Sequence, residues 1–577
     1  MTELAIEILR GQDAAIRLSD QAFLDDWHRL LQTCPWASAY QSEQFVTTWY
    51  RTYSADFEPL IAVGRTQTGG IEGLFFLAVD RSDGQLTVAG ASHAEYQAWL
   101  ADASNGESFI VAAIRRLAEM FPDGKLTLLF VLPETPIDWA RPDGALSDHC
   151  YIRNFKRGLL DIGDGATLSE ILRKKLQNKV NRLKRQGSLT FERVTSPEAF
   201  SSLFDQFNLF QNLRLKAVYN LPGGDTDGLR KPFYDGLFRS TDLIDATALR
   251  LDGRPISIQI HLRNNDQLVL GLISHSPFHA RYSPGAIHLA MLGMRLAEDR
   301  VPVFDLTPGG DYKDRYATHH DEVCVINIFF SRKDAGNYAS KVKAREFFKT
   351  LLERNGISFS GIKKRYLEYL DAARKWRELG ASNALKGLFQ AAMGGIRSRK
   401  QVRLYESEPG AKPAGSVGGL LKMDSLEDLL FYRPVDYRSM PVCGYLRHAM
   451  RLIEDGGHFF THVRNGELGF LGWLIGNGRH NDNDWILGEY LDQGQVVVAT
   501  DIQCRPDAVE SFRQFIAAAM EESNRSGNRL VFALPAERPD LIAAAEDQGL
   551  VLKKTGLRLV RLGRESVSFN PATLDNR

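Results

Sequence analysis

The stretch Arg281-Tyr282-Ser283-Pro284-Gly285-Ala286 stands between a strand-like run, residues 267–274, and an apolar run with helical spacing, residues 287–298. Serine is a favoured N-cap residue and proline suits the first helical position, so a helix is expected to begin at Ser283. Gly285 then leaves the backbone of the first turn uncovered by a side chain. Such a helix start presents unpaired N–H groups and the positive end of the helix dipole. The stretch therefore predicts an anion site suited to a phosphate or pyrophosphate, although an ordinary capped helix would have the same residues.

The size and composition of the chain exclude several classes of protein. Its 577 residues exceed what one core can hold, so about two to four domains are expected. The 71 basic residues balance the 71 acidic ones, which gives no sign of DNA as a partner. Residues 1–20 lack a signal-peptide core, and no run is apolar enough for a transmembrane segment. The five cysteines are scattered without metal-ligand spacing, so we expect a cytoplasmic protein with reduced thiols and no metal site.

Several common enzyme motifs do not occur in the sequence. It contains no Walker loop, no GxSxG elbow, no HExxH and no dinucleotide-binding GxGxxG. P-loop hydrolysis, zincin chemistry and hydride transfer are therefore disfavoured, although active sites can be built without such motifs.

The clearest element pattern lies between about residues 160 and 332. Tight turns at Asp252-Gly253 and Asn264-Asn265-Asp266 predict an antiparallel meander of three strands just before the Ser-Pro-Gly stretch. The predicted strands are residues 188–195, 246–251, 255–262, 267–274, 301–306 and 322–330, and the predicted helices begin at 197, 232, 283 and 311. The order is β-α-α-β-β-β-α-β-α-β.

This order resembles the GNAT acyltransferase fold. The resemblance implies that the central strands splay apart, that the thioester of acyl-CoA enters the gap, and that the loop before the next helix receives the pyrophosphate. The usual glycine-rich signature of that loop is missing, and Ser283-Pro284-Gly285 occupies its place.

Three segments together narrow the resemblance. They are the basic run 173–185, the Tyr282–Gly285 helix start and residues 305–313, which read DLTPGGDYK. They are similar to the CelD/BcsL-type branch of the GNAT superfamily, which is associated with cellulose and other exopolysaccharide synthesis. That branch is related in architecture to the FemABX aminoacyltransferases, which carry two GNAT-like domains in tandem.

The predicted fold class is therefore α/β (α+β), with tandem GNAT folds built from mixed, mostly antiparallel sheets flanked by helices. We expect a degenerate GNAT-like domain over residues 1–158, an acyltransferase domain over 159–333, a helical linker over 334–400 and a third GNAT-like domain over 401–566. The helical spacing at residues 385–396 fits a helix that packs on a neighbouring domain or lies on an anionic membrane surface.

The first and third domains are expected to bind phosphate poorly. Glu107 follows the helix start in the first domain, and Asp507 lies at the same place in the third, so each would repel a pyrophosphate. The polar segment His93-Ala94-Glu95-Tyr96 could face a cleft between domains, or could be an exposed loop with one packed tyrosine.

The resemblance implies a cofactor-binding set around the helix start, namely Tyr282, Ser283, Gly285 and Ala286. It also implies that a backbone N–H of the splayed strand, at Leu272, Ile273 or Ser274, contacts the acyl carbonyl. Lys313 could bind a CoA phosphate or an acidic acceptor, or could be an ordinary solvated lysine. The basic run 173–185 could attract the phosphates of CoA, a nucleotide-sugar or a tRNA, or could be a solvated amphipathic helix.

Three residues are candidates for the chemistry. Asp305 ends a buried strand and could orient or deprotonate the acceptor, or could cap the following loop. Tyr312 could donate a proton to the departing thiolate, as a tyrosine in this region often does in GNAT enzymes. His261 lies in a polar row with Ser257 and Gln259, which suggests a wet cleft and a general base, although a hydrogen-bonded structural histidine is the more common explanation of such a residue.

The expected function is acyl-CoA-dependent N- or O-acyl transfer to a sugar, a polysaccharide precursor or a related envelope metabolite. Acetyl-CoA or another acyl-CoA would be the co-substrate, and a small molecule or glycan the acceptor. Two alternatives stay open: an aminoacyl-tRNA-dependent transferase of the FemABX kind, and a non-catalytic binding component of an exopolysaccharide system. A long coiled-coil arm for tRNA is not evident, which counts against the first of these.

Overall fold

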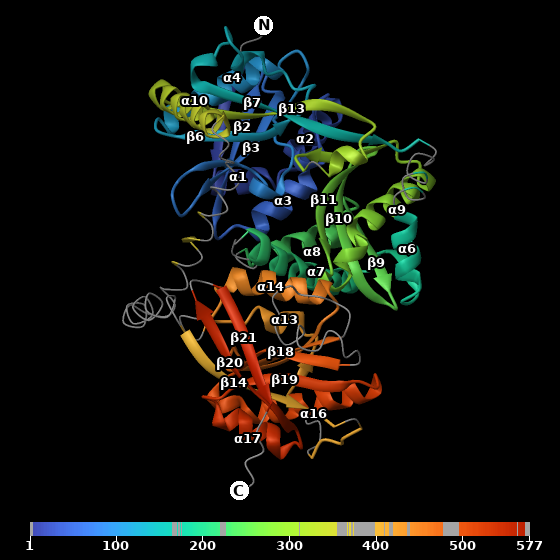
Figure 1. Cartoon of the computed structure of the whole chain (residues 1–577). Coiled ribbons are helices and arrows are strands. Elements are labelled where there is room, and N and C mark those ends of the chain that lie inside the picture. Colours follow the sequence, from blue (N-terminus) through green and yellow to red (C-terminus); the bar gives the residue numbers. More distant parts are fainter. Residues whose placement is uncertain are drawn as a thin grey trace. The chain divides into compact units, whose positions relative to one another are not determined.

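The computed structural model forms two compact units, each of which is treated by itself (Figure 1). The first unit holds Met1–Phe207, Asp227–His275 and Tyr282–Phe359, and the second holds Asn208–Thr226, Ser276–Arg281 and Ser360–Arg577. The structure describes residues 4–163, 176–219, 227–310, 312–354, 398–408, 410–414, 419–434, 439–476, 496–561 and 564–571, with isolated residues at 170, 174, 366, 369, 370 and 373. The predicted helix at 385–396 and most of the predicted loop at 221–228 lie outside these ranges.

A small antiparallel sheet opens the first unit. Its strands are β1 (Ala5–Arg10), β2 (Phe57–Arg65), β3 (Ile71–Asp80), β4 (Leu86–Val88) and β5 (Leu100–Ala101). They run in the order β1-β2-β3-β4, and β5 also pairs with β3. The helices are α1 (Gln12–Arg17), α2 (Gln21–Thr33), α3 (Glu43–Thr52) and α4 (Gly106–Met120).

A larger sheet completes the first unit. Its strands are β6 (Lys125–Val131), β7 (Cys150–Asp161), β8 (Leu189–Arg193), β9 (Ile244–Leu251), β10 (Arg254–Asn264), β11 (Gln267–His275), β12 (Val303–Pro308) and β13 (His319–Phe329). The order across the described sheet is β6-β13-β7-β12-β11-β10-β9-β8. Its helices are α6 (Gln177–Lys184), α7 (Pro197–Arg214), α8 (Arg230–Ser240), α9 (Pro284–Glu298) and α10 (Arg332–Arg354).

Strand β7 crosses the domain boundary that was expected between residues 158 and 159, and β6 joins the same sheet from further upstream. The first part of the chain is therefore tied to the larger sheet by backbone pairing, and the expected domain boundaries stay predictions.

Strands β11 and β12 diverge. They pair in parallel only where Gln267–Val269 lies beside Val303–Asp305. Just beyond this point the pairing of β10 with β11 shifts between Ile260 and Leu262, which marks a β-bulge. The bulge needs a glycine, because a Cβ at Gly271 would lie 2.4 Å from the carbonyl oxygen of Ile260. The second half of β11 consequently leaves β12, and a gap between parallel strands opens at Val269.

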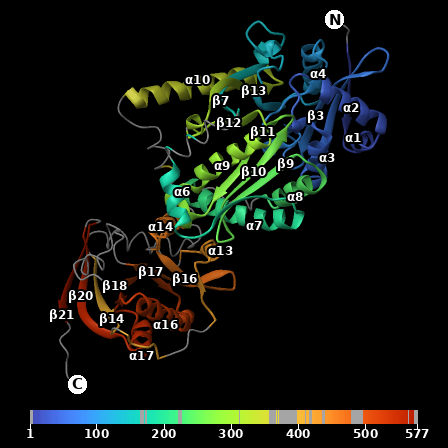
Figure 2. The ribbon, with the colours of Figure 1, turned by 90° about the vertical axis from the view of Figure 1, so that its right-hand side faces the viewer.

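Helices α9 and α6 lie on one face of this sheet (Figures 1 and 2). Phe304 and Leu306 of β12 pack with Leu289, Leu292 and Leu296 of α9 in one buried cluster. Because side chains alternate along a strand, Asp305 faces the opposite side of the sheet. The two faces at the end of β12 thus differ: one is an apolar core under α9, and the other carries a buried carboxylate.

The sheet of the second unit repeats this topology. Its order is β15-β16-β17-β18-β19-β14-β20-β21, so β14 to β20 occupy the places of β7 to β13. Strands β18 and β19 are likewise parallel only at the start, over Val496–Ala499 and Arg529–Phe532. The strands are β14 (Ser398–Glu406), β15 (Lys422–Met423), β16 (His458–Arg464), β17 (Glu467–Gly476), β18 (Val496–Cys504), β19 (Arg529–Pro535), β20 (Val551–Arg561) and β21 (Arg564–Pro571), and the helices are α13 (Leu426–Leu429), α14 (Val442–Glu454), α16 (Val509–Arg525) and α17 (Pro539–Asp547).

The predicted fold class is confirmed: the structure is mixed α/β, with mostly antiparallel sheets flanked by helices. Strand β14 begins at Ser398, inside the expected helical linker, of which α10 forms the described helical part. Within the described residues, no helix combines the length and apolar character needed to cross a membrane.

Candidate functional site

Helix α9 begins where the sequence predicted, but Ser283 does not cap it in the expected way. Ser283 has φ 53° and ψ 55°, and its side chain accepts no capping hydrogen bond from the first turn. A side-chain cap requires an extended N-cap residue, whereas this backbone is left-handed. The carbonyl oxygen of Ser283 instead accepts the N–H groups of Ala286 and Ile287, at 3.0 and 3.2 Å. The hydroxyl of Ser283 is thereby turned away from the helix.

That hydroxyl accepts a hydrogen bond from the ammonium of Lys179 on α6, at 2.6 Å. A lysine at the positive end of a helix dipole is unfavourable by itself, because like charges repel. An anion bound between them would remove the repulsion and contact both. Lys179 thus adds a fixed cation to the helix start that the Ser-Pro-Gly pattern had suggested as an anion site.

The first turn of α9 is open at Gly285. A Cβ placed on Gly285 would have the ring nitrogen Nδ1 of His275 as its nearest neighbour, at 3.9 Å. The space beside the backbone is therefore free of close protein atoms, as a bound phosphate would require. Ala286 is half-buried beside it, and Ile273 is half-buried on β11 past the point where this strand leaves β12.

Helix α6 is held against α9 by apolar packing. Leu176, Val180 and Leu183 pack with Tyr282, Ile287 and Ala290 in one buried cluster. Tyr282 is only 8% exposed, and its hydroxyl accepts a hydrogen bond from Gln186 at 2.6 Å. Tyr282 therefore positions the helix that carries Lys179, and its placement favours packing over direct cofactor contact. Residues 173 and 175 of the predicted basic run lie outside the described residues.

The polar row on β10 is not a wet cleft, contrary to expectation. Ser257, Gln259 and His261 are each at most 1% exposed. Gly271 N–H donates to Nδ1 of His261 at 3.2 Å, which leaves Nε2–H of His261 to donate to Gln259 at 3.1 Å. Gln259 in turn donates to the carbonyl oxygen of Gly285 at 3.3 Å. This hydrogen-bonded row links the bulge of β11 to the first turn of α9.

These contacts favour a structural role for His261 over the general-base role. Burial lowers the pKa of His261 to about 3, and its lone pair already accepts the N–H of Gly271. His288 is similar, since burial lowers its pKa to about 3 and its two ring nitrogens bond Ser257 and Thr247. Neither ring is available to take a proton near neutral pH.

Asp305 anchors a buried polar cluster on the other face of the sheet. The hydroxyl of Tyr96 donates to Oδ2 of Asp305 at 2.6 Å, and Arg157 donates to the same oxygen at 3.1 Å. Thr307 N–H donates to Oδ1 at 2.8 Å, so the loop-capping role considered for Asp305 is also present. Arg157 further bonds Asp321 and lies over the ring of Tyr96, 5.6 Å from its centroid. Burial raises the pKa of Asp305, while Arg157 and Tyr96 act to lower it.

Lys313 belongs to this cluster and not to the start of α9. Its ammonium donates to Oγ1 of Thr307 at 2.7 Å, and burial lowers its pKa. Thr307 has φ 58°, which is strained for a β-branched residue. The loop after β12 is thus held in an unfavourable conformation by Asp305 and Lys313. Tyr312 is 42% exposed beside Lys313, and Asp311 lies outside the described residues.

Glu95 lies near this cluster, although the sequence does not single it out. It precedes Tyr96 in the polar segment 93–96, which proves to face Asp305 across the first unit. Burial, and to a smaller extent Asp305, raises the pKa of Glu95 to about 7, and Lys313 opposes the shift. The only sequence signal was a Glu-Tyr pair in a polar segment, because its neighbours come from far along the chain.

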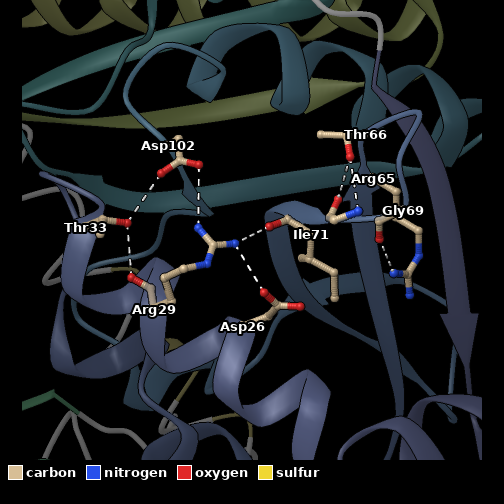
Figure 3. Close-up of polar contacts among 9 residues, drawn as sticks. Asp26, Arg29, Thr33, Arg65, Thr66, Gly69, Ile71 and Asp102 are labelled. Atoms are coloured by element: carbon tan, nitrogen blue, oxygen red, sulfur yellow. Dashed lines mark hydrogen bonds and ion pairs between the residues drawn. The ribbon is translucent and has the colours of Figure 1, made fainter.

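The helix start of the smaller sheet is acidic. Figure 3 shows Asp102, just before α4, held by Thr33 at 3.4 Å and by Arg29 at 3.7 Å. Arg29 also contacts Asp26 and the carbonyl oxygen of Ile71, so its charge is shared. In the same view Arg65, Thr66 and Gly69 hold the β2–β3 turn. This region is a network of structural contacts.

Comparisons with known proteins agree with this fold. A family model for an acetyltransferase (GNAT) domain matches residues 172–318. No curated protein matches the chain in sequence.

Solved structures are similar to parts of the chain at low identity. The crystal structure of FemX is 9% identical, with a TM-score of 0.36, over 53% of this chain and 96% of its own. A tandem GNAT protein from the clavulanic acid biosynthesis pathway is 14% identical, with a TM-score of 0.35, over 57% and 99%. The C-terminal domain of a putative lysylphosphatidylglycerol synthetase from Agrobacterium fabrum is 12% identical, with a TM-score of 0.35, over 56% and 95%. The family match at residues 172–318 covers the diverging strands and the start of α9, so this segment is similar to a GNAT acetyltransferase domain.

Proposed function

We propose that the chain is an acyl-CoA-dependent N- or O-acyltransferase whose acyl-CoA binds at the start of α9 and in the gap between β11 and β12. The single observation that carries the proposal is the helix start itself. There Lys179 bonds Ser283 at 2.6 Å beside an open Gly285, directly after a strand that diverges from its parallel neighbour.

The residues at this site suit the phosphates of CoA. The first turn of α9 offers the backbone N–H of Gly285 and the positive end of the dipole, and Lys179 offers a cation, whereas the N–H of Ala286 already donates to Ser283. The half of β11 that is paired with β10 but not with β12, around Ile273, offers the backbone groups of its free edge to the rest of the acyl-CoA molecule. Acyl-CoA would supply the activated acyl group.

The burial of the side chains around β12 suggests which of them position other groups and which could contact the substrates. Asp305 is 1% exposed and fully bonded, so we assign it to orienting Tyr96, Arg157 and the loop that carries Tyr312. Tyr312 is exposed on that loop and is proposed to donate a proton to the departing thiolate. His261 is proposed to fix the bulge of β11 relative to α9, which positions the acyl carbonyl without contacting it.

The acceptor is proposed to be a sugar, a polysaccharide precursor or a related envelope metabolite in the cytoplasm. This part of the proposal rests on the resemblance to CelD/BcsL-type proteins and on the residues that carry it. A role in cellulose or exopolysaccharide synthesis is proposed on the same ground.

Titration calorimetry with acetyl-CoA and longer acyl-CoAs tests the proposal. Binding of at least one acyl-CoA by the folded protein is expected, and Lys179→Gln should weaken it. Failure of every acyl-CoA to bind would remove the proposal.

A second assay separates the enzyme from its alternatives. Mass spectrometry of amino sugars and hydroxyl sugars incubated with the protein and acetyl-CoA should detect an acylated product. Retention of labelled aminoacyl-tRNA on a filter, without acyl-CoA binding, would favour the tRNA-dependent alternative. Acyl-CoA binding without transfer to any acceptor would favour a binding component.

A further inference from the structure

The segment His93–Tyr96 reaches β12 from the first part of the chain and is held firmly there. Tyr96 is 2% exposed and donates its hydroxyl hydrogen to Asp305 at 2.6 Å. The next residue, Gln97, exchanges backbone and side-chain hydrogen bonds with Leu129 of β6, each at 3.0 Å. Glu95 directly precedes these two anchored residues. The backbone at Glu95 is therefore held in place on its C-terminal side.

Glu95 is surrounded by ionisable side chains from several elements. Asp305 of β12 and Lys313 of the following turn act on its charge. Tyr40, from the turn before α3, and Tyr234, from α8, also face it. Four separate segments thus contribute an ionisable group near Glu95, which is typical of a functional site.

The two carboxylates of the cluster differ in access. Asp305 is 1% exposed, and both of its oxygens accept hydrogen bonds from protein donors. Glu95 is half-buried and so keeps some exposed surface. A general base must contact the proton that it removes, which excludes the buried and fully bonded Asp305 and leaves Glu95 as the more accessible carboxylate.

We propose that Glu95 is the general base of the acyl transfer, and that the first part of the chain thereby completes the catalytic site of the GNAT domain. The inference rests on the proposed function. The amine or hydroxyl of the acceptor attacks the thioester carbonyl, and its proton moves to a carboxylate oxygen of Glu95. The new C–N or C–O bond forms as the C–S bond breaks. The thiolate leaves with its electron pair and takes a proton from Tyr312 or solvent, and Glu95 then returns its proton to solvent.

The ionisation of Glu95 suits this role. Burial and Asp305 raise its pKa to about 7, while Lys313 prevents a larger shift. A base is most effective when its pKa lies near the working pH, because it is then both ionised and basic. An ordinary exposed glutamate has a pKa about two or more units lower and would therefore be a weaker base.

The test measures thiol release from acetyl-CoA, with glucosamine or water as acceptor, alongside calorimetric titration of acetyl-CoA. Glu95→Gln is expected to slow thiol release about 100-fold or more while the acetyl-CoA Kd stays within about twofold. The wild-type rate should rise with a midpoint near pH 7, and the variant should lack this limb. Glu95→Asp should restore part of the rate, because it keeps the carboxylate.

Glu107→Gln is the matched control, because Glu107 lies at the start of α4. Its rate should equal that of the wild type. Equal thiol release from the wild type and Glu95→Gln, zero release included, would overturn the assignment of the base. Failure of the wild type to bind acetyl-CoA would instead remove the proposed function, and the inference with it.

Discussion

The starts of α4 and α9 occupy the same topological place, after a short or diverging strand, but they differ in charge and in space. At α9 a lysine bonds the N-cap residue and the glycine of the first turn faces open space. At α4 the N-cap Asn105 bonds Glu72, and Glu107 lies in the first turn. A Cβ on Gly106 would lie 2.5 Å from the ring of Trp36. The same helix position is therefore open and basic at α9, where we propose a ligand site, and packed and acidic at α4.

The start of α16, described within the second unit, resembles α4 more than α9. Arg505 bonds Glu467, and Asp507 bonds Arg464 at 3.3 Å, so each cation already has an acidic partner. Of the described helix starts of α4, α9 and α16, that of α9 combines a lysine at the N-cap residue with a glycine that no side chain covers, and this difference is the ground on which we propose α9 as the phosphate site.

The largest expected effect is that of Gly285→Asp. A carboxylate at this position would lie in the space assigned to a phosphate, so we expect acyl-CoA affinity to fall at least about 100-fold by clash and charge repulsion. Calorimetry gives the Kd, and circular dichroism checks the fold. Unchanged affinity in a folded variant would show that the pyrophosphate is bound elsewhere.

Alanine at the two glycines should have opposite consequences. Gly106→Ala should lower the free energy of unfolding by about 1–3 kcal/mol, because its Cβ meets Trp36, and should leave acyl-CoA affinity unchanged. Gly285→Ala should leave stability equal or higher, because alanine favours the helix, and should weaken acyl-CoA binding. Urea unfolding and calorimetry on both variants measure this. Equal changes in stability and in acyl-CoA affinity for Gly106→Ala and Gly285→Ala would contradict the proposed difference between the two helix starts.

Removing the cation at α9 should have a smaller effect. Lys179→Gln should weaken acyl-CoA binding about tenfold, which is the range of a charge-assisted hydrogen bond. The loss of acyl-CoA affinity in this variant should be largest at low salt, where charges are screened least. Lys184→Gln on the same helix is the matched control, because Lys184 is exposed and should leave affinity unchanged. Equal losses in both variants would indicate a diffuse basic surface in place of a defined contact.

The dependence of stability on pH should distinguish Glu95 from Glu107. The pKa of Glu95 is raised from 4.5 to about 7, so the folded state binds more protons than the unfolded state between these values. Stability of the wild type must therefore fall as pH rises through this window. Glu95→Gln removes the penalty and should be more stable than wild type at pH 8, by on the order of 1–3 kcal/mol.

The same difference should disappear below about pH 4.5, where Glu95 is protonated in both states. Denaturant unfolding of wild type, Glu95→Gln and Glu107→Gln at pH 5 and pH 8 checks the sign. A pH-independent difference, or an equal gain in Glu107→Gln, would contradict the raised pKa of Glu95.

The sequence predicted local features well and long-range ones poorly. The start of α9, the meander before it and the strand ending at Asp305 follow from local spacing and turn residues. The left-handed backbone of Ser283 could not be foreseen, because serine before proline is compatible with several conformations. His261 was read as facing a wet cleft, because a polar row on a strand looks the same whether water or buried partners satisfy it.

The sequence could not predict the proposed role of Glu95 as a general base, because that role depends on residues far away in the chain. Tyr96 meets Asp305 across 209 residues of chain, and the pKa of Glu95 depends on that meeting. Lys179 was one of several lysines in a basic run, and only the packing of α6 on α9 selects it.

Hydrogen–deuterium exchange with and without acetyl-CoA tests the central claim most directly, because it reads the helix starts of α4, α9 and α16 in one experiment. The account predicts slower exchange on acetyl-CoA addition at residues 283–288 and 268–274. It predicts no change at residues 103–110 or 505–511. Protection at the start of α4 or α16, with none at α9, would contradict it.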